Sequence, residues 1–268
     1  MSEYIVGAEA SEFLRGLEDD SVDLLLTDPP YYGVVEDAWD NCWANERAFA
    51  TWLSELLLLA LPKLTPTGSL VFFGALGRHG SHPLFRIVTA LEDGGYTFRN
   101  WITWKKRRAY GKSHDYLYTR EEVLWFSRSP ERTEIRFNKP YTDEIRGYEG
   151  FDPKYKALSK FKRAANVFND IEDPGTVVDS VTEIFNPQRT CQKPRKLMER
   201  FILAHSDPGD LVVDPFSGWG TTGIEAVRLG RRFRGCEGIL EDARAANERV
   251  LEEVRSAEDD GVLGLFDG

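Results

Sequence analysis

A short motif that could perform chemistry is Asp28-Pro29-Pro30-Tyr31, which follows the apolar run VDLLLT. Two consecutive prolines fix φ at about −65° and remove two backbone N–H donors, so the turn is stiff. The Asp28 carboxylate and the Pro29 carbonyl then form a close pair of acceptors, which suits the two hydrogens of an exocyclic NH₂ group. Tyr31 offers a flat face on which a planar base can stack. The alternative is that Asp-Pro-Pro is a plain turn that ends a strand.

A second motif, DPFSGWGTTG at residues 214–223, ends another apolar run. Gly218 and Gly220 permit positive φ and close backbone approach, and the amides of the helix that follows can meet an anionic or polar cofactor group. Glu237 follows the next apolar stretch, where a carboxylate can accept hydrogen bonds from ribose hydroxyls. The glycines alone also fit a dinucleotide site or a tight packing turn, but the whole string is far more specific.

The elements that must position these motifs alternate between short apolar runs and amphipathic stretches. Such alternation implies βαβ units, so the sequence predicts an α/β fold with a mostly parallel sheet. Ligands bind such sheets at the carboxyl ends of the strands, where both motifs stand. The expected strands are Val22–Thr27, Ser69–Phe73, Phe98–Trp104, Val123–Phe126, Leu211–Val213 and Arg232–Cys236, and the expected helices span about 45–63, 82–93, 194–205, 221–229 and 240–255.

Together the motifs resemble those of the β-group amino-methyltransferases of DNA, in which the DPPY half precedes the cofactor-loop half. The resemblance extends to RNWITWKK, REEVLWFSR and CQKPRKLMERF and covers nearly all of 4–128 and 189–255. It departs at Glu9, 19 positions before Asp28, where the family commonly has Asp, and at 189–191, where Arg-Thr-Cys replaces the frequent His-Pro-Thr. It implies a Rossmann-like class I methyltransferase fold, a mostly parallel twisted sheet with helices on both faces, plus an inserted target-recognition segment.

The resemblance also implies S-adenosylmethionine as the cofactor and an exocyclic amine of a flipped base in duplex DNA as the methyl acceptor. The methyl group would move by direct displacement, without a covalent enzyme–base intermediate. Asp at the first motif position favours N6 of adenine, with N4 of cytosine as the alternative. The predicted catalytic residues are Asp28, Pro29, Pro30 and Tyr31, and the predicted cofactor-binding residues are Glu9, Asp28, Gln192, Lys193, Asp214, Phe216, Ser217, Gly218, Gly220, Thr221, Thr222 and Glu237.

The charge is unevenly distributed along the chain. Lys and Arg total 34 and Asp and Glu total 44, and the net charge of −10 by itself argues against a nucleic-acid partner. Residues 99–163, however, hold 17 basic and 9 acidic residues, a net +8, which leaves −18 for the remainder. Basic residues interleaved with aromatics suit DNA phosphates, although a solvated basic face is the alternative. The predicted DNA-binding residues are Lys105, Lys106, Arg107, Arg108, Lys112, Lys154, Lys156, Lys160, Lys162 and Arg163.

The chain is expected to form one permuted catalytic domain. Residues 1–128 would be the catalytic half, 129–188 the target-recognition segment, 189–256 the cofactor-binding half and 257–268 an acidic tail. The stretch 129–186 has no long apolar run, so we expect an inserted element outside the sheet. Three separated cysteines and no Cys–His pairing predict a reducing compartment and no metal site.

The N-terminal residues lack the pattern of a signal peptide, and no apolar run could span a bilayer, which favours a cytoplasmic protein of prokaryotic or phage origin without a membrane partner. By resemblance, a second copy of the chain and a cognate restriction endonuclease are further candidate partners. Rival interpretations are an RNA or release-factor methyltransferase, whose cofactor loop usually precedes the acceptor turn, a dinucleotide-dependent oxidoreductase, and a DNA-binding regulator with an inactive core.

Overall fold

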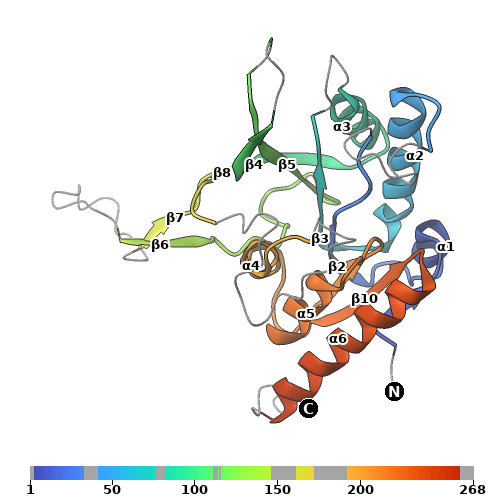
Figure 1. Cartoon of the computed structure of the whole chain (residues 1–268), viewed down its shortest axis with the longest axis vertical. Coiled ribbons are helices and arrows are strands. Elements are labelled where there is room, and N and C mark those ends of the chain that lie inside the picture. The colour runs from blue at the N-terminus through green and yellow to red at the C-terminus, as the bar shows by residue number, and fades with distance from the viewer. Residues whose placement is uncertain are drawn as a thin grey trace.

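A computed structural model describes residues 3–32, 42–76, 82–110, 114, 116–145, 161–171 and 192–259. Its centre is an eight-stranded sheet of order β1-β10-β9-β2-β3-β5-β4-β8 (Figure 1). Five of the seven strand pairs are parallel, and β5 is antiparallel to both of its neighbours. The strands are β1 (Ile5–Gly7), β2 (Val22–Thr27), β3 (Leu64–Gly74), β4 (Thr97–Tyr110), β5 (Tyr118–Ser127), β8 (Val167–Phe168), β9 (Leu211–Asp214) and β10 (Arg232–Glu237).

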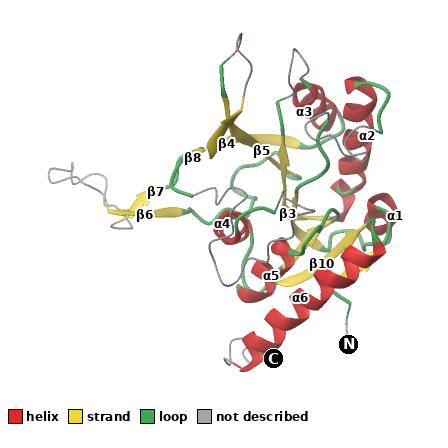
Figure 2. Ribbon diagram, viewed as in Figure 1, coloured by secondary structure: helices red, strands yellow, loops and turns green. Residues whose placement is uncertain are grey.

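Helices cover both faces of this sheet (Figure 2). Along β2 the side chains alternate, so that Leu25 packs with the helices of one face while Leu24 and Leu26 pack with those of the other. Burial on both faces explains why the strand reads as a continuous apolar run. One face carries α1 (Ala10–Arg15), α2 (Glu46–Leu59) and α3 (Pro83–Asp93), and the other carries α4 (Arg195–His205), α5 (Thr221–Arg228) and α6 (Leu240–Asp259).

The chain changes direction between β2 and β9, which are parallel neighbours with Leu25 opposite Val213. From β9 the chain passes through α5 to β10 on one side, and from β2 it passes through α2 to β3 on the other. The loops after β2 and β9 therefore leave the sheet at the same edge and diverge. In open α/β sheets this is the place where a crevice for ligands forms.

The predicted α/β class and each predicted helix and strand are confirmed, with shifted ends. The helix expected over 45–63 ends at Leu59 and is followed by a 3₁₀ turn (Leu61–Lys63) that contains Pro62, which cannot continue a hydrogen-bonded helix. The pattern missed β1 and α1, which are too short to show a clear periodicity. Among the described residues, no helix is both long and apolar enough to cross a membrane.

The expectation that residues 129–186 lie outside the sheet is wrong in part. Strand β8 pairs with β4, with Val167 opposite Thr103 and Phe168 opposite Trp104. Phe168 and Ile171 are buried in the core. These apolar residues are isolated in a polar sequence, so no apolar run indicated them. Upstream, β6 (Tyr141–Ile145) and β7 (Phe161–Arg163) do form a separate two-stranded ribbon that projects from the body (Figure 1).

Candidate active site

The loop after β2 presents Asp28 with both carboxylate oxygens engaged. The Tyr31 hydroxyl donates to Oδ1 at 2.6 Å, and the Lys193 ammonium donates to Oδ2 at 2.5 Å. The motif thus forms a compact turn at the end of a buried strand, as its two prolines predict. The side chain of Asp28 remains about one quarter exposed, so a ligand can reach it.

Lys193 reaches this loop from the residues before α4, 165 positions away in the sequence. Its ammonium also lies 3.3 Å from the Tyr31 hydroxyl, 3.3 Å from Oε2 of Glu121 and over the rings of Tyr31 and Phe73. Glu121 in turn holds Lys106 at 2.7 Å. Two carboxylates and two ammonium groups therefore share one half-buried cluster.

The two carboxylates of this cluster have pKa values shifted in opposite directions. Burial raises the pKa of Asp28 above its ordinary value, although Lys193 opposes that shift. Burial would also raise the pKa of Glu121, but the ammonium groups of Lys193 and Lys106 hold it below the ordinary value. Glu121 is thus the firmly ionised partner, and Asp28 is the group that more readily takes a proton.

The loop after β9 is organised around the buried carboxylate of Asp214. Oδ1 accepts hydrogen bonds from the Thr27 hydroxyl at 2.7 Å and the Phe216 amide at 3.0 Å, and Oδ2 accepts from the Thr222 hydroxyl at 2.8 Å. Burial raises the pKa of Asp214 to about 6, although these donors oppose the shift. Because Thr27 is the residue before Asp28, this carboxylate ties the two loops together.

The backbone after Asp214 forms a shallow cradle. Gly218 and Gly220 adopt φ of +49° and +78°, a region that L side chains rarely enter. A Cβ on Gly218 would meet no described residue within 4 Å. The space beside this glycine is therefore open among the described residues. The Gly218 amide donates to Oε2 of Glu237 at 3.1 Å, and the Ile239 amide donates to Oε1 at 3.2 Å. This glycine cradle beside a half-exposed carboxylate fits a cofactor with a nucleoside part.

The other predicted cofactor residues lie around the same loop, with one exception. Glu9 is exposed at the end of β1, where Gly7 pairs with Glu237. The Gln192 amide donates to the Thr221 hydroxyl at 3.0 Å, at the start of α5. Ser217 donates to the Asp214 carbonyl, while Lys193 lies in the Asp28 cluster. Sequence reasoning missed Thr27 and Glu121, because their role depends on neighbours distant in the chain.

The described cations among the predicted DNA-binding residues have different environments. Lys105 is exposed, Lys106 is paired with Glu121, and Lys162 pairs with Glu144 on the projecting ribbon. Arg163 lines a cavity of about 140 Å³ under β4 and β8. The side chains of Arg107 and Arg108, and the whole of Lys112, Lys154, Lys156 and Lys160, lie outside the described residues.

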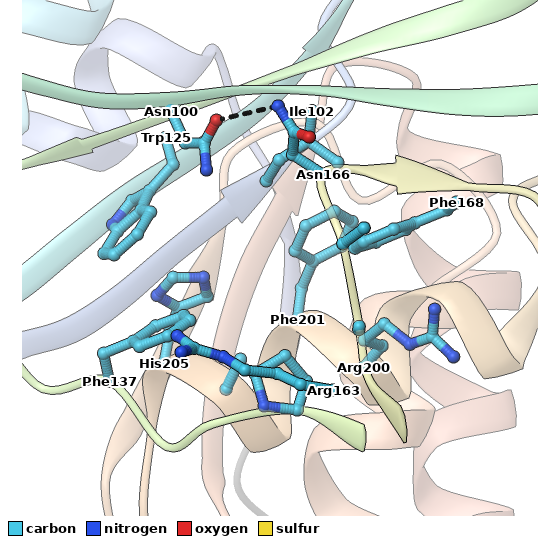
Figure 3. Close-up of a pocket in the computed structure, with 14 residues that line it drawn as sticks. Asn100, Ile102, Trp125, Phe137, Arg163, Asn166, Phe168, Arg200, Phe201 and His205 are labelled. Atoms are coloured by element: carbon cyan, nitrogen blue, oxygen red, sulfur yellow. Dashed lines mark hydrogen bonds between the residues drawn. The ribbon is translucent and has the colours of Figure 1, made fainter. Parts of the chain in front are cut away.

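Several aromatic rings line that cavity, among them those of Trp125, Phe137 and Phe201 (Figure 3). His205 is buried there, and Nδ1 has no hydrogen-bond partner within the described part of the chain. Burial lowers the pKa of His205 to about 3, so the imidazole is neutral. None of the residues of the two loops lines the cavity. It belongs to the packing of residues 137–140 and 163–168 against α4 and the sheet.

Cys236 is buried below the loop after β9, where its thiol contacts the Pro215 carbonyl. Burial raises the pKa of this thiol well above its ordinary value, which makes it a poor nucleophile. Cys42 is exposed, and Cys191 lies outside the described residues. Within the described ranges, no group of three or more His, Cys, Asp or Glu residues could hold a metal ion.

Comparisons with known proteins define the class to which this site belongs. Residues 22–248 match the model of the N6_N4_Mtase family, described as DNA methylase. The chain therefore belongs to the DNA methylase family, and the resemblance seen in the sequence is confirmed.

Individual relatives agree over nearly the whole chain. The type II methyltransferase M1.MboII of Moraxella bovis is 33% identical over 252 residues, covering 88% of this chain and 92% of that protein. The type II methyltransferase M.HpaI of Haemophilus parainfluenzae is 31% identical, with 93% and 74% covered. The solved structure of TTHA0409 from Thermus thermophilus, a complex with S-adenosyl-L-methionine, is 27% identical with a TM-score of 0.62, covering 94% of this chain and 95% of that one.

Proposed function

We propose that this DNA methylase transfers a methyl group from S-adenosylmethionine to N6 of adenine in duplex DNA. The observation that carries the proposal is the meeting of two loops at one sheet edge. The Asp28 loop offers acceptors for an amine, the Gly218 loop offers a cofactor cradle, and the hydrogen bond from Thr27 to Asp214 at 2.7 Å joins them. Methyl transfer to an amine needs both functions within reach of one another.

The Asp28 loop would position and activate the amine. S-adenosylmethionine supplies an electrophilic methyl group when it is bound. Asp28 and the Pro29 carbonyl accept the two amino hydrogens, which turns the nitrogen lone pair out of conjugation with the ring. The Asp28 carboxylate also stabilises the positive charge that develops on nitrogen. The target base must leave the duplex to reach this loop, at a cost of a few kcal/mol.

The cofactor would be held by the loop after β9 and its neighbours. The amides at the start of α5 and the Gly218 backbone form the cradle, and Glu237 retains lone pairs for ribose hydroxyls beyond the two amides that it already accepts. Glu9 and Gln192 flank this cradle. Because backbone amides and a carboxylate build it, the cradle suits the neutral, hydroxyl-bearing nucleoside part of the cofactor.

Adenine is preferred over cytosine because Asp28 occupies the first motif position, as in the adenine-specific members of the group that the motifs resemble. Cytosine N4 is the second candidate, since its amine would meet the same two acceptors. Residues 129–188 and the exposed Lys105 would face the DNA, while the acidic remainder of the chain would be repelled from it. This charge division would orient the enzyme on its substrate.

The test is a transfer assay with tritium-labelled S-adenosylmethionine and plasmid DNA from a strain that lacks DNA methylation. The DNA is digested to nucleosides and separated, and sequencing of the modified plasmid locates the site. The proposal requires label in N6-methyladenine. Label in N4-methylcytosine would select the second candidate, and the absence of label from the DNA would contradict the proposal.

A further inference from the structure

Lys193 occupies the position that the target base would need. Its ammonium lies 2.5 Å from Oδ2 of Asp28, the acceptor proposed for the amino group. It also lies over one face of the Tyr31 ring, 5.4 Å from the ring centroid. One cation thus holds the acceptor and lies over one face of the ring, although it arrives from a different part of the chain.

Little space for a base remains on the side of Tyr31 that faces Phe73 and Leu84. The cleft that Tyr31 lines, between Phe73, Leu84 and α2, has a volume of about 10 Å³. A volume of that size holds a single water at most. Because the Lys193 ammonium donates to Oδ2 of Asp28, it must leave that oxygen before a base amine can donate there.

Glu121 provides a second position for the same ammonium. Its Oε2 lies 3.3 Å from Lys193 Nζ and is buried without a hydrogen bond from the described residues, while Lys106 at 2.7 Å fixes Oε1. Glu121 comes from β5, the antiparallel strand next to β3, and so does not depend on the Asp28 loop for its position. A small rotation of the Lys193 side chain would exchange one carboxylate for the other.

We propose that Glu121 is a positioning residue that receives the Lys193 ammonium from Asp28 when the target base enters. The inference rests on the proposed function, because it needs an amine that competes for Asp28. A buried ammonium cannot be left without a counter-ion, since breaking a buried pair costs about 3–5 kcal/mol. Transfer to Glu121 keeps Lys193 paired throughout, and the cluster of Asp28, Glu121, Lys106 and Lys193 stays neutral.

The test replaces Glu121 by glutamine, which keeps the shape and removes the charge. A duplex that keeps adenine at the methylation site found by sequencing, with 2-aminopurine as the neighbouring base, reports base extrusion by its fluorescence, in the presence of the unreactive cofactor analogue sinefungin. Without Glu121 the ammonium stays on Asp28. We expect Glu121→Gln to lower both the fluorescence increase and the single-turnover rate by about tenfold or more, with cofactor affinity unchanged. Glu121→Asp, which restores the charge, should recover most of both signals.

A double-mutant cycle separates this role from a general structural one. If Glu121 acts only through Lys193, its substitution in a Lys193→Met background should change the fluorescence signal by no more than about twofold. The control is Asp23→Asn. The half-buried carboxylate of Asp23 lies near the start of β2, at the other end of that strand from Asp28, and accepts a hydrogen bond from the Leu211 amide. That change should leave base extrusion and turnover as in the wild type.

Two results would overturn the inference. One is a Glu121→Gln enzyme with wild-type fluorescence and rate, and the other is an equal loss in the wild-type and Lys193→Met backgrounds. A wild-type enzyme that transfers no label to DNA would instead contradict the proposed function. Since the wild-type assay is run first, the two failures are told apart.

Discussion

Asp28 directly follows β2 and Asp214 is the last residue of β9, a neighbouring parallel strand, yet the surroundings of the two carboxylates differ. Asp214 is buried and accepts three hydrogen bonds from neutral donors, two of which belong to its own loop and helix. Asp28 is partly exposed and is held by the cation of Lys193 and the hydroxyl of Tyr31. The hydrogen bonds of Asp214 hold the two loops in a fixed arrangement. The bond of Asp28 to Lys193, by contrast, comes from a cation on a flexible side chain, which a ligand can displace.

The largest effect on stability should come from removal of the Asp214 carboxylate, which holds the two loops together. Asp214→Ala leaves the Thr27 hydroxyl, the Thr222 hydroxyl and the Phe216 amide without their acceptor. Unsatisfied buried donors cost about 1–3 kcal/mol each, and partial rearrangement should leave a net loss of about 3 kcal/mol. Urea denaturation monitored by tryptophan fluorescence measures this loss. A loss no greater than that of Asp28→Ala would contradict the distinction between the two residues.

The pH dependence of stability tests whether the buried Asp214 carboxyl titrates in the folded protein. Burial raises the pKa of Asp214 to about 6 in the folded protein, whereas the carboxyl titrates near its ordinary value in the unfolded chain. Between these values the folded state binds more protons, so stability falls as pH rises from about 4 to about 6, by up to about 3 kcal/mol. Asp214→Asn cannot ionise and should flatten this fall.

Urea midpoints of wild type and Asp214→Asn, measured in steps between pH 4 and pH 7, check the linkage. The difference in unfolding free energy between the two proteins should change across the interval. A constant difference would mean that Asp214 does not titrate in this range.

Gly218 and Gly220, in the loop after β9, allow effects on stability to be separated from effects on cofactor binding. In Gly220→Ala the added methyl meets the Ala246 carbonyl at 3.2 Å with φ at +78°, so stability should fall by about 1–2 kcal/mol. In Gly218→Ala the methyl meets none of the described residues but projects into the proposed cradle, so cofactor affinity should fall by about tenfold. Isothermal titration with S-adenosylmethionine compares the two. Wild-type affinity in Gly218→Ala would place the cofactor elsewhere.

The smallest expected effect concerns two adjacent cations beside the Asp28 cluster. Lys105 is exposed, while Lys106 is held by Glu121. A phosphate contact contributes about 0.9 to the slope of log affinity against log salt, so Lys105→Ala should reduce that slope by about this amount. Lys106→Ala should change the slope less. Fluorescence anisotropy of a labelled duplex at several salt concentrations measures both, and equal slopes would argue against DNA contact at Lys105.

Features that depend on local sequence could be predicted. Asp28-Pro29-Pro30-Tyr31 sets its own turn, and the apolar run before it identifies a strand buried on both faces. The alternation of strands and helices predicts the mostly parallel sheet, although it does not give the order of the strands. Both motifs could therefore be assigned to one sheet edge from the sequence alone.

Features that depend on packing between distant segments could not be predicted. Lys193 was expected at the cofactor, but the start of α4 lies where its ammonium reaches Asp28. Glu121 joins the cluster through the antiparallel register of β5 against β4. Arg99 was counted with the basic face, yet it donates to Ser127 and the Ser129 carbonyl, and burial lowers its pKa. The amino-acid composition gives the number of such cations, but it does not show which of them already bind other groups of the protein.

The most direct test of the central claim is the single-turnover rate of methyl transfer from a cofactor-saturated enzyme to DNA, measured for Asp28→Asn and Asp214→Asn side by side. Saturation removes cofactor binding from the measurement. Asp28→Asn should slow transfer by about 10³-fold, and Asp214→Asn should stay within about tenfold of wild type at a temperature where it is folded. A wild-type rate in Asp28→Asn would contradict the assignment of methyl transfer to the Asp28 loop, which follows β2.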